Sequence, residues 1–285
     1  MDNQKERRHQ ILMAMTPLIV SVLILGICLL ALALDQNSQE TSLQAGKNSK
    51  FTQELKEAKA KLQMGLNTWN PETLKAARDL FLKLLLKGSG NQAYLSYYIA
   101  LTDYRLATFY LSSNNKEEAE RFITEGQRYL EKTMEAEPTF GESFALYAYL
   151  LGYEIALSPE KGMTLGFKIF EYFAKASEID PDNPRINLLQ GISLLYTPEE
   201  YGGGADKSIE FLRKSVSLFE KENIQDPLKP SWGREEAYTF LGSAYKQKKE
   251  YEKARELLKK ALEINPDFGL AKRELSAIEK EAKVK

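Results

Sequence analysis

Residues 235–266 read EEAYTFLGSAYKQKKEYEKARELLKKALEINP, and this stretch decides the fold class. Its apolar residues recur at helical spacing in two groups, which are Leu241 and Tyr245, then Ala254, Leu258 and Ala261. Gly242 and Ala261 are small enough to let two helix backbones approach closely, and Asn265 with Pro266 can end one helix and begin another. The stretch therefore predicts two antiparallel helices that pack on each other.

The spacing of the larger set of small and apolar residues identifies the kind of hairpin. These positions are Tyr238, Leu241, Gly242, Tyr245, Ala254, Leu258, Ala261 and Pro266. In this pattern the segment resembles a tetratricopeptide repeat, with Tyr238 where that repeat often has Trp. The resemblance implies a solenoid of helical hairpins that binds another protein or a peptide on the concave face lined by its first helices.

Similar patterns upstream predict further hairpins. The expected helix pairs lie at 51–68 with 71–87, 91–111 with 115–136, within 144–181, and within 184–221, and a capping helix follows at 267–282. In the third pair, Leu151 and Gly152 resemble Leu241 and Gly242. The third and fourth pairs carry insertions around Gly162 and at 197–206, and we expect Trp232 to pack on the helix that follows it.

The N-terminus carries a long apolar run. No charged residue occurs from Ile11 to Leu34, and as a helix this run would span about 36 Å, enough to cross a bilayer. Basic residues precede the run and acidic residues follow it, which favours a cytoplasmic N-terminus. The alternative is an exported soluble protein, cleaved near Ala33 at the A-x-A-like site formed with Ala31.

These features predict an all-α chain in four parts. We expect a cytoplasmic tail at 1–10, a transmembrane signal anchor at 11–34, a flexible linker at 35–50 and a tetratricopeptide-like solenoid at 51–285. The solenoid should contain about four to five helical hairpins plus the C-terminal capping helix. The predicted localisation is a single-pass membrane protein with its C-terminal domain extracytoplasmic, and periplasmic if the organism is Gram-negative.

Composition restricts the possible chemistry. The chain has a net charge of -1, and this balance is not that of a nucleic-acid-binding protein. Its one Cys, Cys28, and its one His, His9, both precede the solenoid. We therefore expect no disulfide, no thiolate or imidazole metal site, no cofactor and no His-based catalysis in the main domain.

Aromatic and apolar residues on the expected first helices are candidates for partner binding. The candidate residues are Tyr149, Tyr153, Arg185, Leu188, Leu195 and Tyr196. Tyr side chains combine an apolar ring with a hydroxyl, and Arg185 could pair with a partner's carboxylate. The alternative is that most of these Tyr side chains only fill space between stacked helices.

The predicted function is that of a non-catalytic, membrane-anchored scaffold or adaptor whose concave groove binds a protein or peptide. The alternative is a small-solute binding or transport accessory protein, because the tetratricopeptide-like T-components of periplasmic solute transport systems also have irregular helical repeats and export signals. An enclosed pocket with converging polar groups would favour this alternative, whereas an open groove would favour the scaffold.

Overall fold

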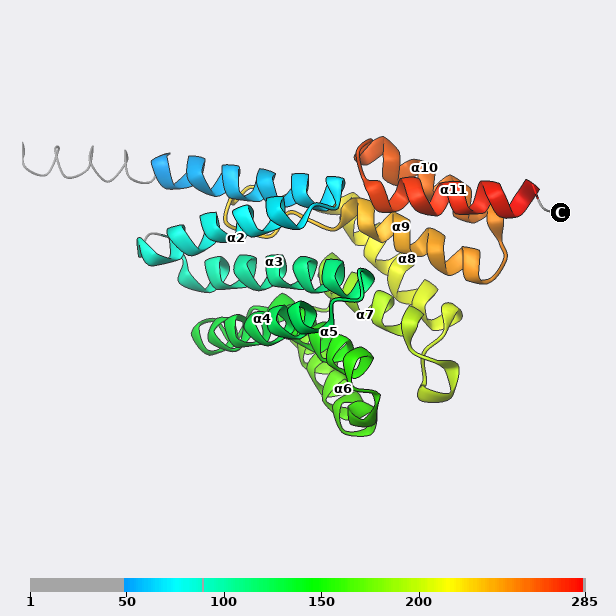
Figure 1. Ribbon diagram of the computed structural model, residues 1–285, viewed down its shortest axis with the longest axis horizontal. Helices are drawn as coiled ribbons and strands as arrows, with labels where there is room; N and C mark the ends of the chain where they lie inside the picture. The colour runs from blue at the N-terminus through cyan, green and yellow to red at the C-terminus, as the bar shows by residue number, and fades with distance from the viewer. Residues whose placement is uncertain (1–48, 89, 284–285) are drawn as a thin grey trace, which may run out of the picture. The chain divides into compact units, whose positions relative to one another are not determined.

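The computed structural model describes residues 49–88 and 90–283, and the fold is that of the unit formed by residues 53–285. Every regular element in the described part is helical (Figure 1). A first helix covers residues 49–68. The α-helices after it are α2 (Pro71–Leu86), α3 (Gln92–Ser112), α4 (Lys116–Ala136), α5 (Gly141–Leu157), α6 (Gly162–Ile179), α7 (Pro184–Tyr196), α8 (Ala205–Lys221), α9 (Arg234–Gln247), α10 (Tyr251–Ile264) and α11 (Gly269–Lys283). The predicted all-α solenoid of helical hairpins with a terminal helix is therefore confirmed.

Short polar side chains set the start of several helices. The side chains of Asn70, Asn91, Asn115 and Asn183 each accept a hydrogen bond from a backbone N–H in the first turn of the helix that follows. Pro follows the cap in α2 and α7, where its missing N–H costs nothing. These caps fix the hairpin boundaries close to those expected from the sequence.

Glycine lies at the crossing point of three hairpins. A Cβ added at Gly65, Gly191 or Gly242 would lie 2.7–3.1 Å from the side chain of Leu74, Leu212 or Leu258 in the next helix. The expected close contact at Gly242 is thus confirmed. The proposed equivalence of Gly152 is wrong, because a Cβ there would meet no atom within 4 Å.

Two hairpins have short 3₁₀ helices in the turn between their helices. One is η1 (Pro159–Lys161), and the other is η2 (Glu199–Tyr201). After η2, Gly202 and Gly204 have φ values of 86° and 103°, and the N–H of Gly204 donates to the carbonyl of Leu194 at 2.9 Å. The glycine-rich segment is therefore a tight turn that requires glycine.

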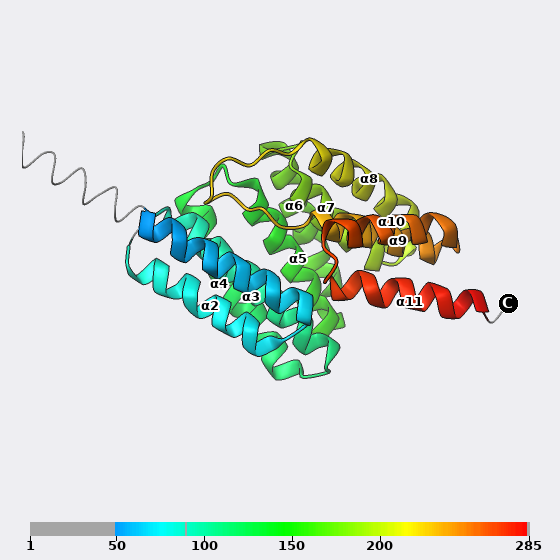
Figure 2. The ribbon, with the colours of Figure 1, turned by 90° about the horizontal axis from the view of Figure 1, so that it is seen from above.

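The first helix also packs on the last hairpin. Leu66 belongs to an apolar cluster with Tyr238, Phe268 and Ile278. The amide groups of Asn67 and Asn265 hydrogen-bond to each other, with nitrogen–oxygen distances of 2.9 and 3.3 Å. Figure 2 shows residues 53–68 in blue reaching the turn before α11 in red. We call this contact the closing seam, because it joins repeats that are far apart in the sequence.

The predicted membrane span, residues 11–34, lies outside the described residues, as do the predicted tail and most of the predicted linker. Within residues 49–88 and 90–283, no helix has the length and apolar character needed to cross a bilayer.

Candidate functional site

An extended segment crosses the inner side of the hairpin stack. Residues 222–233, here called the connector, join α8 to α9 and are drawn in gold in Figure 2. Two prolines, Pro227 and Pro230, prevent a regular helix there. Gly233 has a φ of 104° and turns the chain into α9. The connector therefore occupies the surface on which a tetratricopeptide-like groove would be expected.

Side chains from the first helix and from α3 hold the connector by its carbonyls. The Lys59 ammonium donates to the carbonyls of Pro227 and Lys229 at 3.0 Å each. The Tyr98 hydroxyl donates to the same Lys229 carbonyl at 2.9 Å. Because of burial and the charge of Arg185, the pKa of Lys59 falls to about 8.

Trp232 anchors the end of the connector. Its indole N–H donates to the Tyr97 hydroxyl of α3 at 3.1 Å, and its ring lies 5.0 Å from the Arg105 guanidinium. The ring thus contacts α3, and the expectation that Trp232 also packs on the following helix stays a prediction. The connector directs the ring back across the molecule, where a hydroxyl satisfies its N–H.

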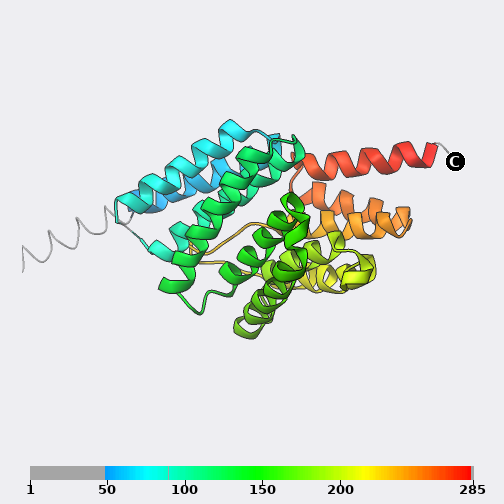
Figure 3. The same ribbon diagram turned by 60° about the horizontal axis from the view of Figure 1, so that its bottom comes forward.

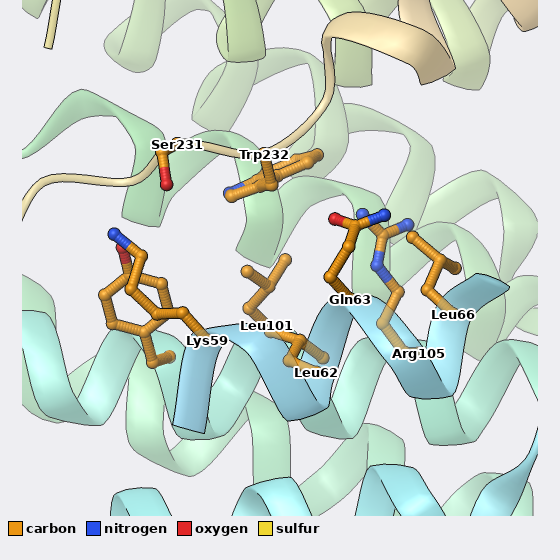
Figure 4. A pocket seen from close by; sticks show the side chains of 9 residues that line it. Lys59, Leu62, Gln63, Leu66, Leu101, Arg105, Ser231 and Trp232 are labelled. Carbon is orange, nitrogen blue, oxygen red and sulfur yellow. The ribbon is translucent and has the colours of Figure 1, made fainter. Parts of the chain in front are cut away.

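A cavity remains between the connector and the helices (Figure 4). It measures about 50 Å³, and its lining comes from the first helix, α3 and the connector: Lys59, Leu62, Gln63, Leu66, Tyr98, Leu101, Arg105, Ser231 and Trp232. A water molecule takes about 30 Å³ of the liquid, whereas a typical ligand pocket measures about 300–1,000 Å³. This cavity can hold a water or two but no organic solute.

Two ion pairs lie beside the cavity and the connector, one fully buried and one with a buried guanidinium and a partly exposed carboxylate. Arg105 of α3 donates to both carboxylate oxygens of Glu236 of α9, at 2.6 and 2.7 Å. Burial alone would lower the pKa of Arg105, but the Glu236 carboxylate outweighs it, and the pKa is raised. Arg185 of α7 donates in the same bidentate way to Glu222 at 2.6 and 2.9 Å. Both pairs hold the charged guanidinium in one fixed place.

A hydrogen-bonded chain connects the second ion pair with Trp232. Glu142 of α5 lies 3.5 Å from Arg185 and accepts from the Tyr97 hydroxyl at 2.9 Å. The same Tyr97 oxygen accepts from Trp232. The buried carboxylate, hydroxyl and indole groups are therefore paired along a line through α3, α5, α7 and the connector, whereas the Nε of Arg185 has no hydrogen-bond partner.

Four candidate residues are buried, and two of these, Arg185 and Leu188, lie against the connector. Arg185 is buried and paired with Glu222, so it cannot serve as a free anchor for a partner's carboxylate. Leu188 is fully buried, because the backbone of Gly233 lies directly on it: a Cβ there would be 3.0 Å from the leucine side chain. Leu188 therefore does not lie on an exposed surface, where a partner-binding residue would be expected.

The other four candidates fall at one end of the inner surface. Leu195 and Tyr149 are buried, and the ring of Tyr149 lies 5.1 Å from that of Tyr153. The half-buried Tyr153 shares a hydrogen bond of 2.7 Å with Thr108. Tyr196 is 66% exposed. The structure thus brings Tyr149 and Tyr153 together and leaves Tyr196 open to solvent, so binding at Tyr153 and Tyr196 stays a prediction.

The sequence did not predict the connector as a site, nor the side chains that hydrogen-bond to it, which are Lys59, Tyr97 and Tyr98. The available signal was the pair of prolines beside Trp232, since an apolar ring in a polar loop needs a surface to cover. Over the described ranges, no three His, Cys, Asp or Glu side chains gather as a possible metal site.

Comparisons with known proteins agree with the hairpin architecture. Residues 235–268 match the tetratricopeptide repeat family. The chain is similar to the HusA haemophore from Porphyromonas gingivalis, with 25% identity and a TM-score of 0.57 over 70% of this chain and 93% of that one. It is also similar to a thermophilic TPR protein of Thermus thermophilus, with 17% identity and a TM-score of 0.50 over 78% of this chain and 98% of that one. No curated protein sequence matches it. The chain is thus a tetratricopeptide-like helical solenoid that carries a tetratricopeptide repeat at residues 235–268.

Proposed function

We propose that the protein is a non-catalytic scaffold that binds a protein or peptide partner at the rim around Tyr196. The observation that carries this proposal is the exposure of Tyr196 and Tyr201, 66% and 78%, on a stack whose inner surface is already filled by the connector. Tyrosine rings with polar edges are frequent anchors at protein interfaces.

Affinity capture with single variants tests this proposal. We expect Tyr196→Ala and Tyr201→Ala to weaken capture of the same partner, with a cost of about 2 kcal/mol for an anchor residue. Lys259→Ala on α10 is the matched control, because Lys259 is an exposed residue on a second helix. Unchanged capture by both Tyr variants, with normal helicity and melting, would rule the rim out.

We also propose that residues 11–34 anchor the protein in a membrane as a single pass, with the solenoid on the extracytoplasmic side. The uncharged run and the basic residues before it support this orientation. Intact-mass measurement of protein extracted from its native membranes should give the uncleaved chain. A mature chain that begins at Leu34 would favour the alternative, an exported soluble protein.

Small-solute binding is the second candidate function. The similarity to a haemophore over 70% of the chain favours it, and a tyrosine such as Tyr153 or Tyr196 can ligate haem iron. The 50 Å³ cavity speaks against an enclosed solute, so a porphyrin would have to lie on the surface. Haemin titration followed by the Soret absorbance of haemin tests this function. A shift of the Soret band that Tyr196→Phe abolishes would support haem binding. Absence of a shift at about 10 µM protein, where a site of micromolar affinity would be occupied, would exclude it.

A further inference from the structure

The middle of the connector, residues 223–229, makes few contacts with the helices, and we call it the strap. Most of its residues are exposed, and none of them is buried. The N–H groups of Leu228 and Lys229 donate to the side chain and to the carbonyl of Asp226, at 2.9 and 3.2 Å. These bonds shape the strap but do not attach it to the stack. Figure 3 shows the connector in gold as a trace without helical turns.

The two ends of the strap are fixed. Before it, Glu222 accepts two hydrogen bonds from the buried Arg185 guanidinium, at 2.6 and 2.9 Å. After it, Pro230 and Trp232 are buried, and the Trp232 indole donates to the Tyr97 hydroxyl. The strap therefore spans the distance between two anchored points.

Between these ends, the hydrogen bonds that join the strap to the described helices come from two side chains. Lys59 donates to two carbonyls of the strap, and Tyr98 donates to one of the same two. Water can replace these donors, because Pro227 and Lys229, which carry the carbonyls, are exposed. Loss of one typical hydrogen bond shifts an opening equilibrium about fivefold. A segment held by so few contacts opens at a low free energy.

The helices on either side keep other contacts when the strap opens. Helix α9 follows the connector directly, and the bidentate pair of Glu236 with Arg105 ties it to α3. The neighbouring Glu235 accepts from Gln63 of the first helix at 2.9 Å. Opening of the strap therefore leaves both the stack and the closing seam in place.

The strap covers two hydrogen-bond donors that the helices hold in position. Tyr98 is 1% exposed, and its ring stacks on that of Phe81 at a centroid distance of 5.0 Å. The Lys59 ammonium lies 5.1 Å from the centre of the Tyr98 ring. Both side chains line the cavity of about 50 Å³, and Figure 4 shows Lys59 at the end marked by Ser231. The position of these donors therefore does not depend on the strap.

We propose that the strap is a gate over this cavity. It opens between its fixed ends, and the Lys59 ammonium and the Tyr98 hydroxyl then face solvent in an otherwise unchanged stack. The closed form satisfies both donors with its own carbonyls, and the open form leaves them available to acceptor oxygens of other molecules. The gate does not depend on partner binding at the rim around Tyr196.

Two chemical probes applied to the full chain in detergent test the gate. A short pulse of an acetylating ester modifies Lys59, and tetranitromethane nitrates Tyr98, and peptide mass spectrometry gives both rates. Pro227→Gly is the test variant, because glycine gives the open strap more backbone freedom and leaves both donors in place. We expect the two rates to rise together by about two- to fivefold, since both side chains are uncovered by the same opening.

Lys56 and Tyr97 are the internal controls. Lys56 is exposed on the same helix as Lys59, and Tyr97 is buried at the fixed Trp232 end, so their rates should equal those of the wild type. A rise at Lys59 alone would mean that this side chain moves without the strap. Unchanged rates at both Lys59 and Tyr98 would mean that the connector stays closed, and either result would overturn the proposal.

Removal of one donor gives an independent measurement. Tyr98→Phe deletes a hydroxyl and keeps the ring on Phe81, so acetylation of Lys59 should become about fivefold faster. Tyr147→Phe on α5 is the matched control, because it deletes a hydroxyl that bonds to Glu131 of α4 at 3.1 Å. It should leave the Lys59 rate unchanged. The same Lys59 rate in Tyr98→Phe as in the wild type would contradict the gate.

Urea distinguishes opening of the strap from unfolding of a hairpin. The strap exposes little surface, so the Lys59 rate in Pro227→Gly should be nearly independent of urea below the global transition. Amide exchange in α9 and the melting temperature should match those of the wild type. A urea dependence as steep as that of global unfolding, or faster exchange in α9, would show that the hairpin opens instead and would overturn the proposal.

Discussion

Lys59 links the first helix to the connector and carries a shifted pKa. Its folded-state value of about 8 lies below the ordinary value of 10.5, so the folded protein releases this proton first. The contribution of Lys59 to the free energy of unfolding should therefore rise between about pH 8 and 10.5, and be lost as the pH falls through 8. The urea midpoints of the wild type and of Lys59→Met should be compared from pH 7 to 10.5. We expect the wild-type midpoint to rise relative to that of the variant as the pH increases, and a constant difference between the two midpoints would contradict the lowered pKa.

Arg105 and Glu236 join α3 to α9 through a buried bidentate pair. Glu236→Leu leaves the guanidinium charged and unpaired, and we expect a loss of about 3–5 kcal/mol in the free energy of unfolding by urea denaturation. The double variant Arg105→Met with Glu236→Leu should lose less than Glu236→Leu alone. The surface pair of Lys253 with Glu250 is the control, and Lys253→Ala should cause no measurable change. If the double variant lost as much free energy of unfolding as the two single variants together, this pairing would be contradicted.

At the scale of the helix, glycine has different roles in α5 and α9. Gly152→Ala should raise the free energy of unfolding by about 0.5–1 kcal/mol, because the added methyl group meets open space and the unfolded chain loses freedom. Gly242→Ala should lower it by about 1–3 kcal/mol, because its methyl group would lie 3.1 Å from Leu258 and 3.2 Å from the Ala254 carbonyl. Chemical denaturation of both variants checks this contrast, and two shifts of the same sign would contradict the helix contacts.

The hairpins could be predicted from the sequence because their determinants are local. Capping residues such as Asn70 and Asn183 and the apolar spacing around Leu258 act within one or two turns. The wrong assignment of Gly152 has a physical cause. Gly152 lies near the end of α5, shortly before the longer turn that contains η1. A Leu–Gly pair at this place therefore does not meet the next helix, although it matches Leu241 and Gly242 in sequence.

The site could be predicted only in part, because its contacts join residues far apart in the chain. Arg105 meets Glu236, 131 residues away, and Lys59 meets Pro227 across 168 residues. Helical periodicity places Tyr149 and Tyr153 on the inner side, but it cannot indicate that the connector fills the neighbouring surface. Arg185 and Leu188 are buried because the connector covers this surface.

At the scale of the whole domain, the closing seam should couple the first helix to the last hairpin. In an open solenoid each repeat contacts only its neighbours, so a substitution loosens its own repeat and the adjacent ones. Here Leu66 packs with Tyr238 and Phe268, and a Cβ at Gly269 would lie 2.9 Å from the Asn67 carbonyl. Leu66→Ala should therefore loosen both ends of the domain.

Hydrogen exchange of the full chain measures this coupling. Leu66→Ala should lower the free energy of unfolding by about 2–4 kcal/mol. Amide exchange should become faster in residues 53–68 and also in α10 and α11, while α5 and α6 keep their wild-type exchange rates. Leu212→Ala, at the crossing with Gly191, is the control, and its faster exchange should stay within α7, α8 and α9. Faster exchange limited to residues 53–86 in Leu66→Ala would mean that the seam transmits no stability, and that the domain behaves as an open stack.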